Sequence, residues 1–297
     1  MRVLVLGGTG SIGSAVVTEL LKKTHIVTTL CRSNSAAARA RELGAAVLAG
    51  SICAPADWVD CLSDMDAVIH VATGFGTDAA DVDRALLSEI FKHAAGRARL
   101  SAGGAAPDKL RFIYTGGMWL FGSRSAAPHA ETPYQAPAPW QWAADGCRRV
   151  LLNPDIHGMV IHPANVTDDE AGVPPILLAD ARAAGHIRMP ISEEATWPLV
   201  RRDDLARLYA MVLEHGAEAS VHFGVSEAAV SRAELVRRTA LVTGLAAEVR
   251  VIPIEVWQLR YGEWAIGYSL SQTGAPRPHP PEARSPRARI VSWCTMR

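Results

Sequence analysis

The chain has 297 residues, which at about 150 residues per domain allows one large or two small domains. Its 30 Lys and Arg residues balance 30 Asp and Glu residues, and this excludes a general nucleic-acid binder, which needs a basic surplus to displace counterions from phosphates. Hydrophobic residues make up 49% of the chain, enough for a large core, but no apolar run reaches the roughly 18 to 20 residues that span a bilayer.

The amino terminus and the cysteines indicate a cytoplasmic protein. Met1–Leu6 has neither the basic region nor the cleavage site of a secretory signal. The 5 cysteines are scattered and none forms a C-x-x-C pair, so we expect reduced thiols, no disulfide framework and no metal site.

The first 165 residues alternate apolar runs with helical patterns, which predicts an α/β fold, a doubly wound parallel sheet of the Rossmann type. Nearly continuous hydrophobicity is typical of strands buried on both faces. Strands are expected at Val3–Leu6, Ile26–Leu30, Ala45–Leu48, Ala67–Ala72, Arg111–Thr115 and Gly158–His162. Helices are expected at Ser14–Lys23, Ala36–Leu43 and Leu86–Ala95.

After His162 the elements become shorter and prolines more frequent. Residues 166–270 are predicted to form a smaller α/β lobe, partly interleaved with the first domain, on the carboxyl ends of the strands. Residues 271–297 hold a dense mixture of Pro and Arg and are predicted to be an irregular tail. In the lobe we expect helices at Ile176–Ala184, Asp203–Glu214, Ser231–Val242 and Glu255–Glu263, and short strands at Ser220–Val225 and Glu248–Ile252.

A glycine-rich turn follows the first strand and carries the strongest functional signal. Gly7, Gly10 and Gly13 have a G-x-x-G-x-x-G spacing, a variant of the dinucleotide fingerprint, which needs a tight turn and close approach of the backbone to a pyrophosphate. The phosphates would face the positive end of the following helix. The alternative is a tight turn with a purely structural role. The cofactor-binding residues expected here are Gly7, Thr9, Gly10, Ser11, Ile12 and Gly13.

The end of the second strand indicates which dinucleotide binds. A site selective for NAD places an acid there to accept hydrogen bonds from the ribose 2′-hydroxyl. This chain has Arg32 and Ser33 instead, which suit a 2′-phosphate, so we expect NADP(H) to bind. The alternative is that Arg32 is a solvated residue at the strand end.

Several motifs together resemble the short-chain dehydrogenase/reductase superfamily, in its extended or atypical branch, over roughly residues 1–270. They are the turn at 7–13, Asp66–Ala72, Phe112–Thr115 leading to Phe121 and Gly122, His162–Val166, and Val200–Ala206. The resemblance implies that Ala72 and Thr73 line the cofactor, and that His162 and Asn165 lie near the nicotinamide. It also implies that the protein can form a homodimer through a pair of helices.

The catalytic motif of that superfamily is degenerate here. Its chemistry uses a Ser or Thr and a Tyr-x-x-x-Lys, in which Tyr is the acid or base. The Ser position is Gly117, the Tyr position falls near Trp140, and no lysine follows Lys109. Thr115 and Tyr134 are the nearest hydroxyl groups and become the candidate catalytic residues.

Aromatic residues cluster where the pocket mouth is expected, which favours a small apolar or aromatic substrate over a nucleotide sugar. The sequence therefore predicts an NADP(H)-dependent oxidoreductase acting on a carbonyl or enone. Two alternatives stay open: a non-redox isomerase, lyase or cyclase, and an NADP(H)-binding regulatory protein without turnover. The aromatic residues are Phe75, Trp119, Phe121, Trp140, Trp142 and Trp197.

Overall fold

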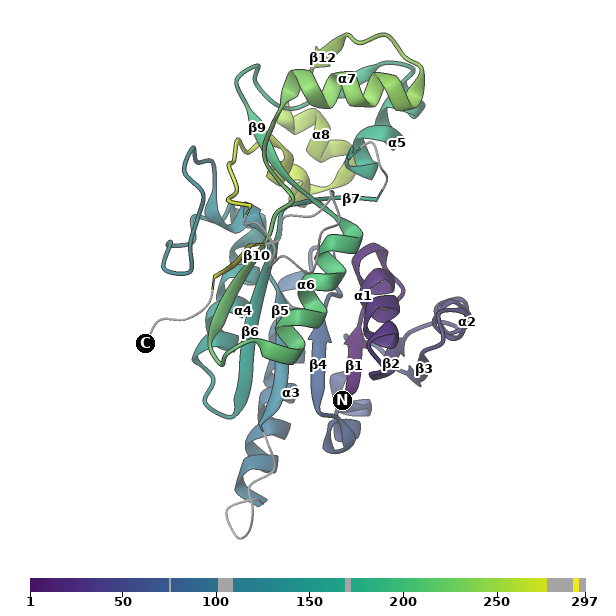
Figure 1. Cartoon of the computed structure of the whole chain (residues 1–297), viewed down its shortest axis with the longest axis vertical. Coiled ribbons are helices and arrows are strands. Elements are labelled where there is room, and N and C mark those ends of the chain that lie inside the picture. Colours follow the sequence, from purple (N-terminus) through teal and green to yellow (C-terminus); the bar gives the residue numbers. More distant parts are fainter. Residues whose placement is uncertain (75, 101–108, 169–171, 277–290, 294–297) are drawn as a thin grey trace.

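The computed structural model describes residues 1–74, 76–100, 109–168, 172–276 and 291–293 (Figure 1). An eight-stranded sheet with helices on both faces forms the larger body, and a smaller lobe lies above the carboxyl ends of its parallel strands. Open α/β sheets bind ligands at those ends. The lobe therefore stands where it can close a binding site.

The central sheet has the strand order β13-β10-β6-β5-β4-β1-β2-β3, and only the β10–β13 pair is antiparallel. The order reverses between β1 and β4, which opens a crevice there, and this confirms the predicted doubly wound α/β class. The strands are β1 (Arg2–Leu6), β2 (Ile26–Cys31), β3 (Ala46–Ala49), β4 (Ala67–His70), β5 (Leu110–Thr115), β6 (Ile156–Pro163), β10 (Ser220–Gly224) and β13 (Val291–Trp293).

Helices cover both faces of this sheet, which is why its central strands are mostly apolar and buried. Helices α1 and α6 pack side by side on one face, and α3 and α4 on the other (Figure 1). The large helices of this body are α1 (Ser11–Lys22), α2 (Asn34–Glu42), α3 (Ala79–Leu100), α4 (Gln141–Leu152) and α6 (Arg202–His215).

The smaller lobe has its own hydrophobic core, which includes the buried residues Trp197, Leu235 and Trp257. It contains a three-stranded sheet in the order β11-β9-β7 and a two-stranded sheet of β12 and β8. Its strands are β7 (Asn165–Thr167), β8 (Ile187–Met189), β9 (Thr196–Arg201), β11 (Glu227–Ser231) and β12 (Val249–Val251), and its helices are α5 (Pro175–Ala184), α7 (Arg232–Thr243) and α8 (Ile254–Tyr261).

The chain enters the lobe, returns to the central sheet and then enters the lobe again. Helix α6 packs on α1, and β10 pairs in parallel with β6. The sequence predicts the strand at Ser220–Val225 as part of the lobe, and this prediction is wrong: all five residues of β10 are buried in the central sheet. A strand with two covered faces belongs in the parallel sheet, whatever its place in the sequence.

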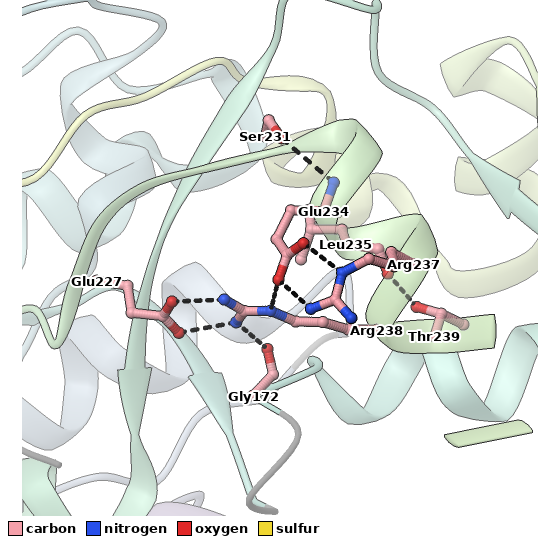
Figure 2. Close-up of polar contacts among 8 residues, drawn as sticks. All are labelled: Gly172, Glu227, Ser231, Glu234, Leu235, Arg237, Arg238 and Thr239. Atoms are coloured by element: carbon pink, nitrogen blue, oxygen red, sulfur yellow. Dashed lines mark hydrogen bonds and ion pairs between the residues drawn. The ribbon is translucent and has the colours of Figure 1, made fainter. Parts of the chain in front are cut away.

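An arginine in α7 links three segments of the lobe (Figure 2). Arg238 donates two hydrogen bonds to the carboxylate of Glu227 on β11, at 2.9 and 2.7 Å, and one to Glu234 at 2.7 Å. It also reaches the carbonyl oxygen of Gly172 at 3.4 Å. Arg237 pairs with the same Glu234, but its side chain is exposed.

The predicted tail is only partly described. Gln272 is buried, and its side-chain amide donates to the carbonyl oxygens of Met118 and Gly122 at 2.6 and 2.7 Å. The backbone N–H groups of Gln272 and Gly274 donate to Thr196 and Ala228 of the lobe, so the start of the predicted tail is held between the two bodies, and β13 pairs with β10 further on. Most of the Pro- and Arg-rich stretch lies outside the described residues.

None of the helices in the described part of the chain is long and apolar enough to cross a membrane. Within the same residues, no three His, Cys, Asp or Glu side chains are grouped as ligands for a metal ion.

Candidate functional site

The glycine turn between β1 and α1 is shaped by close backbone contacts. Gly7 has a φ of +86°, and a Cβ atom on it would lie 2.7 Å from the backbone of Ala72 at the end of β4. A Cβ atom on Gly13 would lie 2.1 Å from the carbonyl oxygen of Gly7, so α1 can pack on the turn only with glycine there. These are the demands of a dinucleotide turn.

The amino-terminal end of α1 carries no side-chain cap. Gly10 is the N-cap residue, and a Cβ atom on it would meet only the Gly7 carbonyl oxygen, at 3.3 Å. Backbone N–H groups at an uncapped helix start attract an anion. The side chains of Ser11 and Ile12 border the cavity described below, and Thr9 is half-buried in the turn. This end of the helix therefore fits a pyrophosphate.

One acid stands beside this helix start. Ser11 donates a hydrogen bond from its Oγ to Asp168 Oδ1 at 3.1 Å, and Arg202 lies 3.6 Å from the same oxygen. Asp168 thus contacts the first residue of α1, directly after the glycine turn, and Asp169 and Glu170 lie outside the described residues. A carboxylate here opposes a bound phosphate, and the Arg202 cation offsets part of that repulsion.

The end of β2 is open to solvent. Arg32 is exposed, and Ser33 caps α2 by accepting a hydrogen bond from the Ala36 backbone N–H at 3.2 Å. Ser33 also shares a hydrogen bond with Ser35 at 3.0 Å. A cation and two hydroxyl groups, with no acid from Cys31 to Ser35, fit a ribose 2′-phosphate.

A cavity of about 420 Å³ lies at the carboxyl ends of β4 and β5, beside the glycine turn. Predicted residues that line it are Ala72, Thr73, Thr115 and Asn165. Its aromatic wall contains the expected Trp119, Trp140 and Trp142, together with Trp264 and Tyr268.

Trp264 and Tyr268 come from a short 3-10 helix at Glu263–Ser269, and sequence reasoning missed both. The rings of Trp119 and Trp264 stack at 6.3 Å, and the indole N–H of Trp140 donates to the Trp264 carbonyl oxygen at 2.8 Å. A Cβ atom on Gly267 would lie 2.1 Å from the Trp119 ring, so the segment lies flat on that ring. The lobe thereby supplies one wall of the cavity.

Two of the expected aromatic residues, Phe121 and Trp197, are described by the structure but do not line this cavity. Phe121 packs against His162 and Phe223 in the larger core, and Trp197 packs against Tyr268 in the core of the lobe. Phe75 lies outside the described residues.

The hydroxyl of Thr115 is engaged on both sides. It donates to the carbonyl oxygen of His70 at 2.6 Å and accepts from the hydroxyl of Tyr209 at 2.6 Å. Burial raises the pKa of Tyr209, so that phenol keeps its proton. Thr115 borders the cavity, but its single proton is already used within the protein.

Tyr134 and His162 lie in a layer beneath Gly116 and Gly117, and neither lines the cavity. The His162 Nδ1 accepts the Gly117 backbone N–H at 3.1 Å, and its Nε2 lies 3.2 Å from the Tyr134 hydroxyl. Burial lowers the pKa of His162 to about 3, so the ring is neutral and Nε2 donates to Tyr134. Tyr134 bonds in turn to Cys147, and burial raises the pKa of its phenol.

This layer explains Gly116, the neighbour of the superfamily's Ser position, whereas a Cβ atom on Gly117 itself would meet no atom within 4 Å. A Cβ atom on Gly116 would lie 2.4 Å from the His162 ring and 3.0 Å from the Cys147 sulfur. The structure therefore separates the predicted residues: Thr115 and Asn165 border the cavity, while Tyr134 and His162 support its floor. The placement of Tyr134 argues against direct contact with a substrate.

The degenerate motif is apolar in the structure as well. Trp140 stands at the start of α4, and Ala144, at the Lys position, is buried. A different polar group borders the same cavity: His70, Asp83 and Tyr114, from β4, α3 and β5. The sequence contained a partial signal, since His70 and Tyr114 each lie in the carboxyl-terminal half of a predicted strand, but Asp83 had none.

The chain is similar in sequence to known proteins. Residues 3–142 match the sequence profile of the NAD dependent epimerase/dehydratase family. An uncharacterized protein of Saccharomyces cerevisiae is 27% identical over 275 residues, which cover 88% of this chain and 86% of that protein.

Two other similarities concern a fragment and the fold. The photosystem II assembly factor Ycf39 of Synechocystis sp. is 40% identical over 82 residues, and the match spans 28% of this chain but only 25% of Ycf39. The crystal structure of UDP-glucuronic acid 4-epimerase from Bacillus cereus, in complex with UDP-glucuronic acid and NAD, matches with a TM-score of 0.70 at 17% identity. That match covers 93% of this chain and 90% of the epimerase.

Proposed function

We propose that this chain is an NADP(H)-dependent reductase. It matches the sequence profile of the NAD dependent epimerase/dehydratase family over residues 3–142 and has the fold of the extended short-chain dehydrogenase/reductases. Its substrate would be a small apolar or aromatic carbonyl compound or enone. The observation that carries this proposal is an uncapped glycine turn that opens beside an aromatic cavity.

The cofactor assignment rests on the two ends of the predicted dinucleotide site. The start of α1 offers backbone N–H groups to the pyrophosphate, and Arg32 with Ser33 offers a cation and a hydroxyl to the 2′-phosphate. Ala72 and Thr73 would lie behind the cofactor, and Asn165 would lie near its nicotinamide end. When bound, NADPH would supply a hydride to the substrate.

The substrate class follows from the cavity wall. Four indoles and the phenol ring of Tyr268, from two lobes, form this wall, and a nucleotide sugar needs several polar and basic contacts that the wall lacks. An apolar ligand with one hydrogen-bonding oxygen suits it better. The protein would orient that ligand and exclude water from it.

A second candidate is an NADP(H)-binding partner protein without turnover. Ala144 stands where the superfamily has its lysine, and Gly117 stands at the Ser position. In addition, the fragment match is to a protein described as an assembly factor. A non-redox isomerase, lyase or cyclase on the same fold is the remaining alternative.

Titration with NADPH and NADH, followed by tryptophan fluorescence and calorimetry, tests the cofactor assignment. Arg32→Ala should weaken NADPH binding about tenfold, for the loss of about 1.5 kcal/mol from a hydrogen bond to a charged group, and should leave NADH binding unchanged. Arg41→Ala, which removes an exposed cation from the same helix region, is the matched control.

Gly10→Asp should abolish the binding of both nucleotides, because it places a carboxylate at the helix start, where the added Cβ atom would meet only the Gly7 carbonyl oxygen, at 3.3 Å. If wild-type protein binds neither nucleotide, the proposal and the partner-protein alternative both fail. Oxidation of NADPH that requires an aromatic aldehyde or enone would then separate the reductase from the alternatives. Product formation without change in the cofactor would indicate an isomerase or lyase.

A further inference from the structure

Three buried polar side chains from three elements meet at the wall of the cavity. His70 Nε2 lies 3.3 Å from Asp83 Oδ1, and the Tyr114 hydroxyl donates to the same oxygen at 3.0 Å. The exposed fractions are 4% for His70, 7% for Asp83 and 2% for Tyr114, so this group is part of the interior. All three residues line the cavity.

The backbone is built to hold this group. His70 and Tyr114 are register partners on β4 and β5, and their rings meet edge to face with centroids 5.4 Å apart. On α4, a Cβ atom at Gly146 would lie 2.5 Å from the Tyr114 hydroxyl and 3.1 Å from Asp83 Oδ2. Only glycine lets this helix approach so closely.

The hydrogen bonds determine which nitrogen of His70 carries a proton. Asp83 accepts from Tyr114, whose pKa is raised well above its ordinary value by burial and by the Asp83 charge, so the phenol stays a donor. A carboxylate only accepts, so His70 Nε2 must be the donor in the second bond. The neutral ring then has its lone pair on Nδ1.

That lone pair has no partner in the part of the chain that the structure describes. The Nδ1 atom of His70 is buried and makes no hydrogen bond among the described residues. Buried polar atoms are nearly always paired, so an orphan on a cavity-lining side chain indicates a partner that comes from outside. The other hydroxyl at this end of the cavity, that of Thr115, is engaged by His70 O and Tyr209.

We propose that His70 Nδ1 binds the oxygen of the ligand and exchanges a proton with it, while Asp83 holds the ring and Tyr114 holds Asp83. The ligand class is an apolar or aromatic alcohol and the carbonyl compound related to it. The arrangement is a base oriented by a buried carboxylate, as in other acid–base sites. The redox part of this inference rests on the proposed function; the contact with the ligand oxygen does not.

The proton balance is simple in both directions. In reduction, a hydride from NADPH would form the new C–H bond at the carbonyl carbon and leave NADP+, and the electron pair displaced from C=O remains on the oxygen, which takes the proton from Nδ1 of the imidazolium and leaves a neutral ring. In oxidation, neutral Nδ1 accepts the hydroxyl proton while the C–H bond of the alcohol breaks and its hydride would pass to NADP+, and the positive charge forms on the ring next to Asp83. Solvent restores the protonation state of the ring between turnovers.

The test uses the full chain without cofactor, labelled with ¹⁵N-histidine, and two probes that differ by a hydroxyl group: benzyl alcohol and toluene. His70→Gln assigns the His70 resonances, and His215→Gln, at an exposed site, is the control. Benzyl alcohol should move the Nδ1 resonance of His70, and toluene should not.

Affinity provides a second readout. For the wild-type protein, the Kd for benzyl alcohol should be about tenfold lower than the Kd for toluene, because one additional hydrogen bond forms. His70→Phe should lose this preference for the alcohol. Asp83→Asn, a smaller change, should weaken the preference for benzyl alcohol, because an amide no longer fixes the proton on Nε2 of His70. The inference is overturned if both probes act alike on Nδ1, if His70→Phe keeps the preference, or if neither probe enters the cavity.

The kinetic arm separates this inference from the proposed function. With NADPH and benzaldehyde, His70→Gln should lower kcat by about 10²–10⁴-fold and leave the Kd for NADPH unchanged. If no turnover occurs but the probes behave as expected, the proposed reductase fails and His70 stands as the ligand contact. If turnover occurs and His70→Gln retains it, the assignment of His70 fails alone.

Discussion

Asp168→Asn should tighten the binding of both NADPH and NADH by about tenfold. The carboxylate lies 3.1 Å from Ser11 Oγ, so a pyrophosphate on the α1 start would lie about 6 Å from it. Two unit charges at that separation repel by about 3 kcal/mol at an effective dielectric constant of about 20. Salt and the neighbouring Arg202 reduce this to about 1.4 kcal/mol, which is a factor of ten.

Calorimetric titrations at two salt concentrations would measure this gain. Because the charges are partly exposed, the gain should shrink toward unity near 1 M salt, where the screening length is about 3 Å. Asp64→Asn is a suitable control, since Asp64 also pairs with an arginine but lies near the amino-terminal end of the sheet. An unchanged or weaker affinity in Asp168→Asn would refute the placement of the pyrophosphate beside Ser11.

Three further predictions concern stability. Gly13→Ala should abolish nucleotide binding and lower the free energy of unfolding by about 1–3 kcal/mol, because the added carbon overlaps backbone atoms. Gly96→Ala, in open space on α3, should instead raise the free energy of unfolding by about 0.5–1 kcal/mol. Urea denaturation of both variants checks this, and equal effects would contradict it. Arg238→Ala should lower the free energy of unfolding by about 1–3 kcal/mol, because it removes the hydrogen bonds to the carboxylates of Glu227 and Glu234. Arg237→Ala, at an exposed side chain, should leave that free energy nearly unchanged. Similar losses for the two variants in thermal melts would show that the Arg238 network does not stabilise the fold. The free energy of unfolding should fall as the pH falls from about 6.5 toward 3, by up to about 1.4 kcal/mol per pH unit, because His162 binds a proton in the unfolded chain but stays neutral when buried. His162→Phe should flatten this dependence of stability on pH, and an unaltered dependence would contradict the buried neutral ring.

The sequence was a good guide to the central sheet and a weaker one to the lobe. Buried parallel strands leave continuous apolar runs in the sequence, so the positions of these runs were enough to locate the first six strands. Strands β7, β8 and β12 have three residues each, too few to show a period, and β9 contains Pro198, which reads as a break. The pairing of β10 with β6 could not be predicted from the sequence, because the order of strands along the chain does not determine which sheet a strand joins.

The candidate site divides in the same way. The glycine turn is local, and its spacing alone indicated its geometry. The cavity wall is not local: Trp264 approaches Trp119 across more than a hundred residues, and no pattern in the sequence connects them. For the tyrosine, distance from the superfamily's motif favoured Tyr134, whereas the structure brings Tyr114 to the cavity through the register of β4 and β5.

The excursion of the chain between β6 and β10 has a consequence for synthesis on the ribosome. The outer edge of β6 is covered by β10, and β10 emerges only after β7, α5, β8, β9 and α6 have been made. At about 5–20 residues per second, that edge stays without a partner for several seconds in a nascent chain that already holds six strands. An unpaired apolar edge is a template for pairing with other chains. The period in which this protein most needs protection by a chaperone therefore falls late, between the completion of β6 and the arrival of Ser220–Gly224.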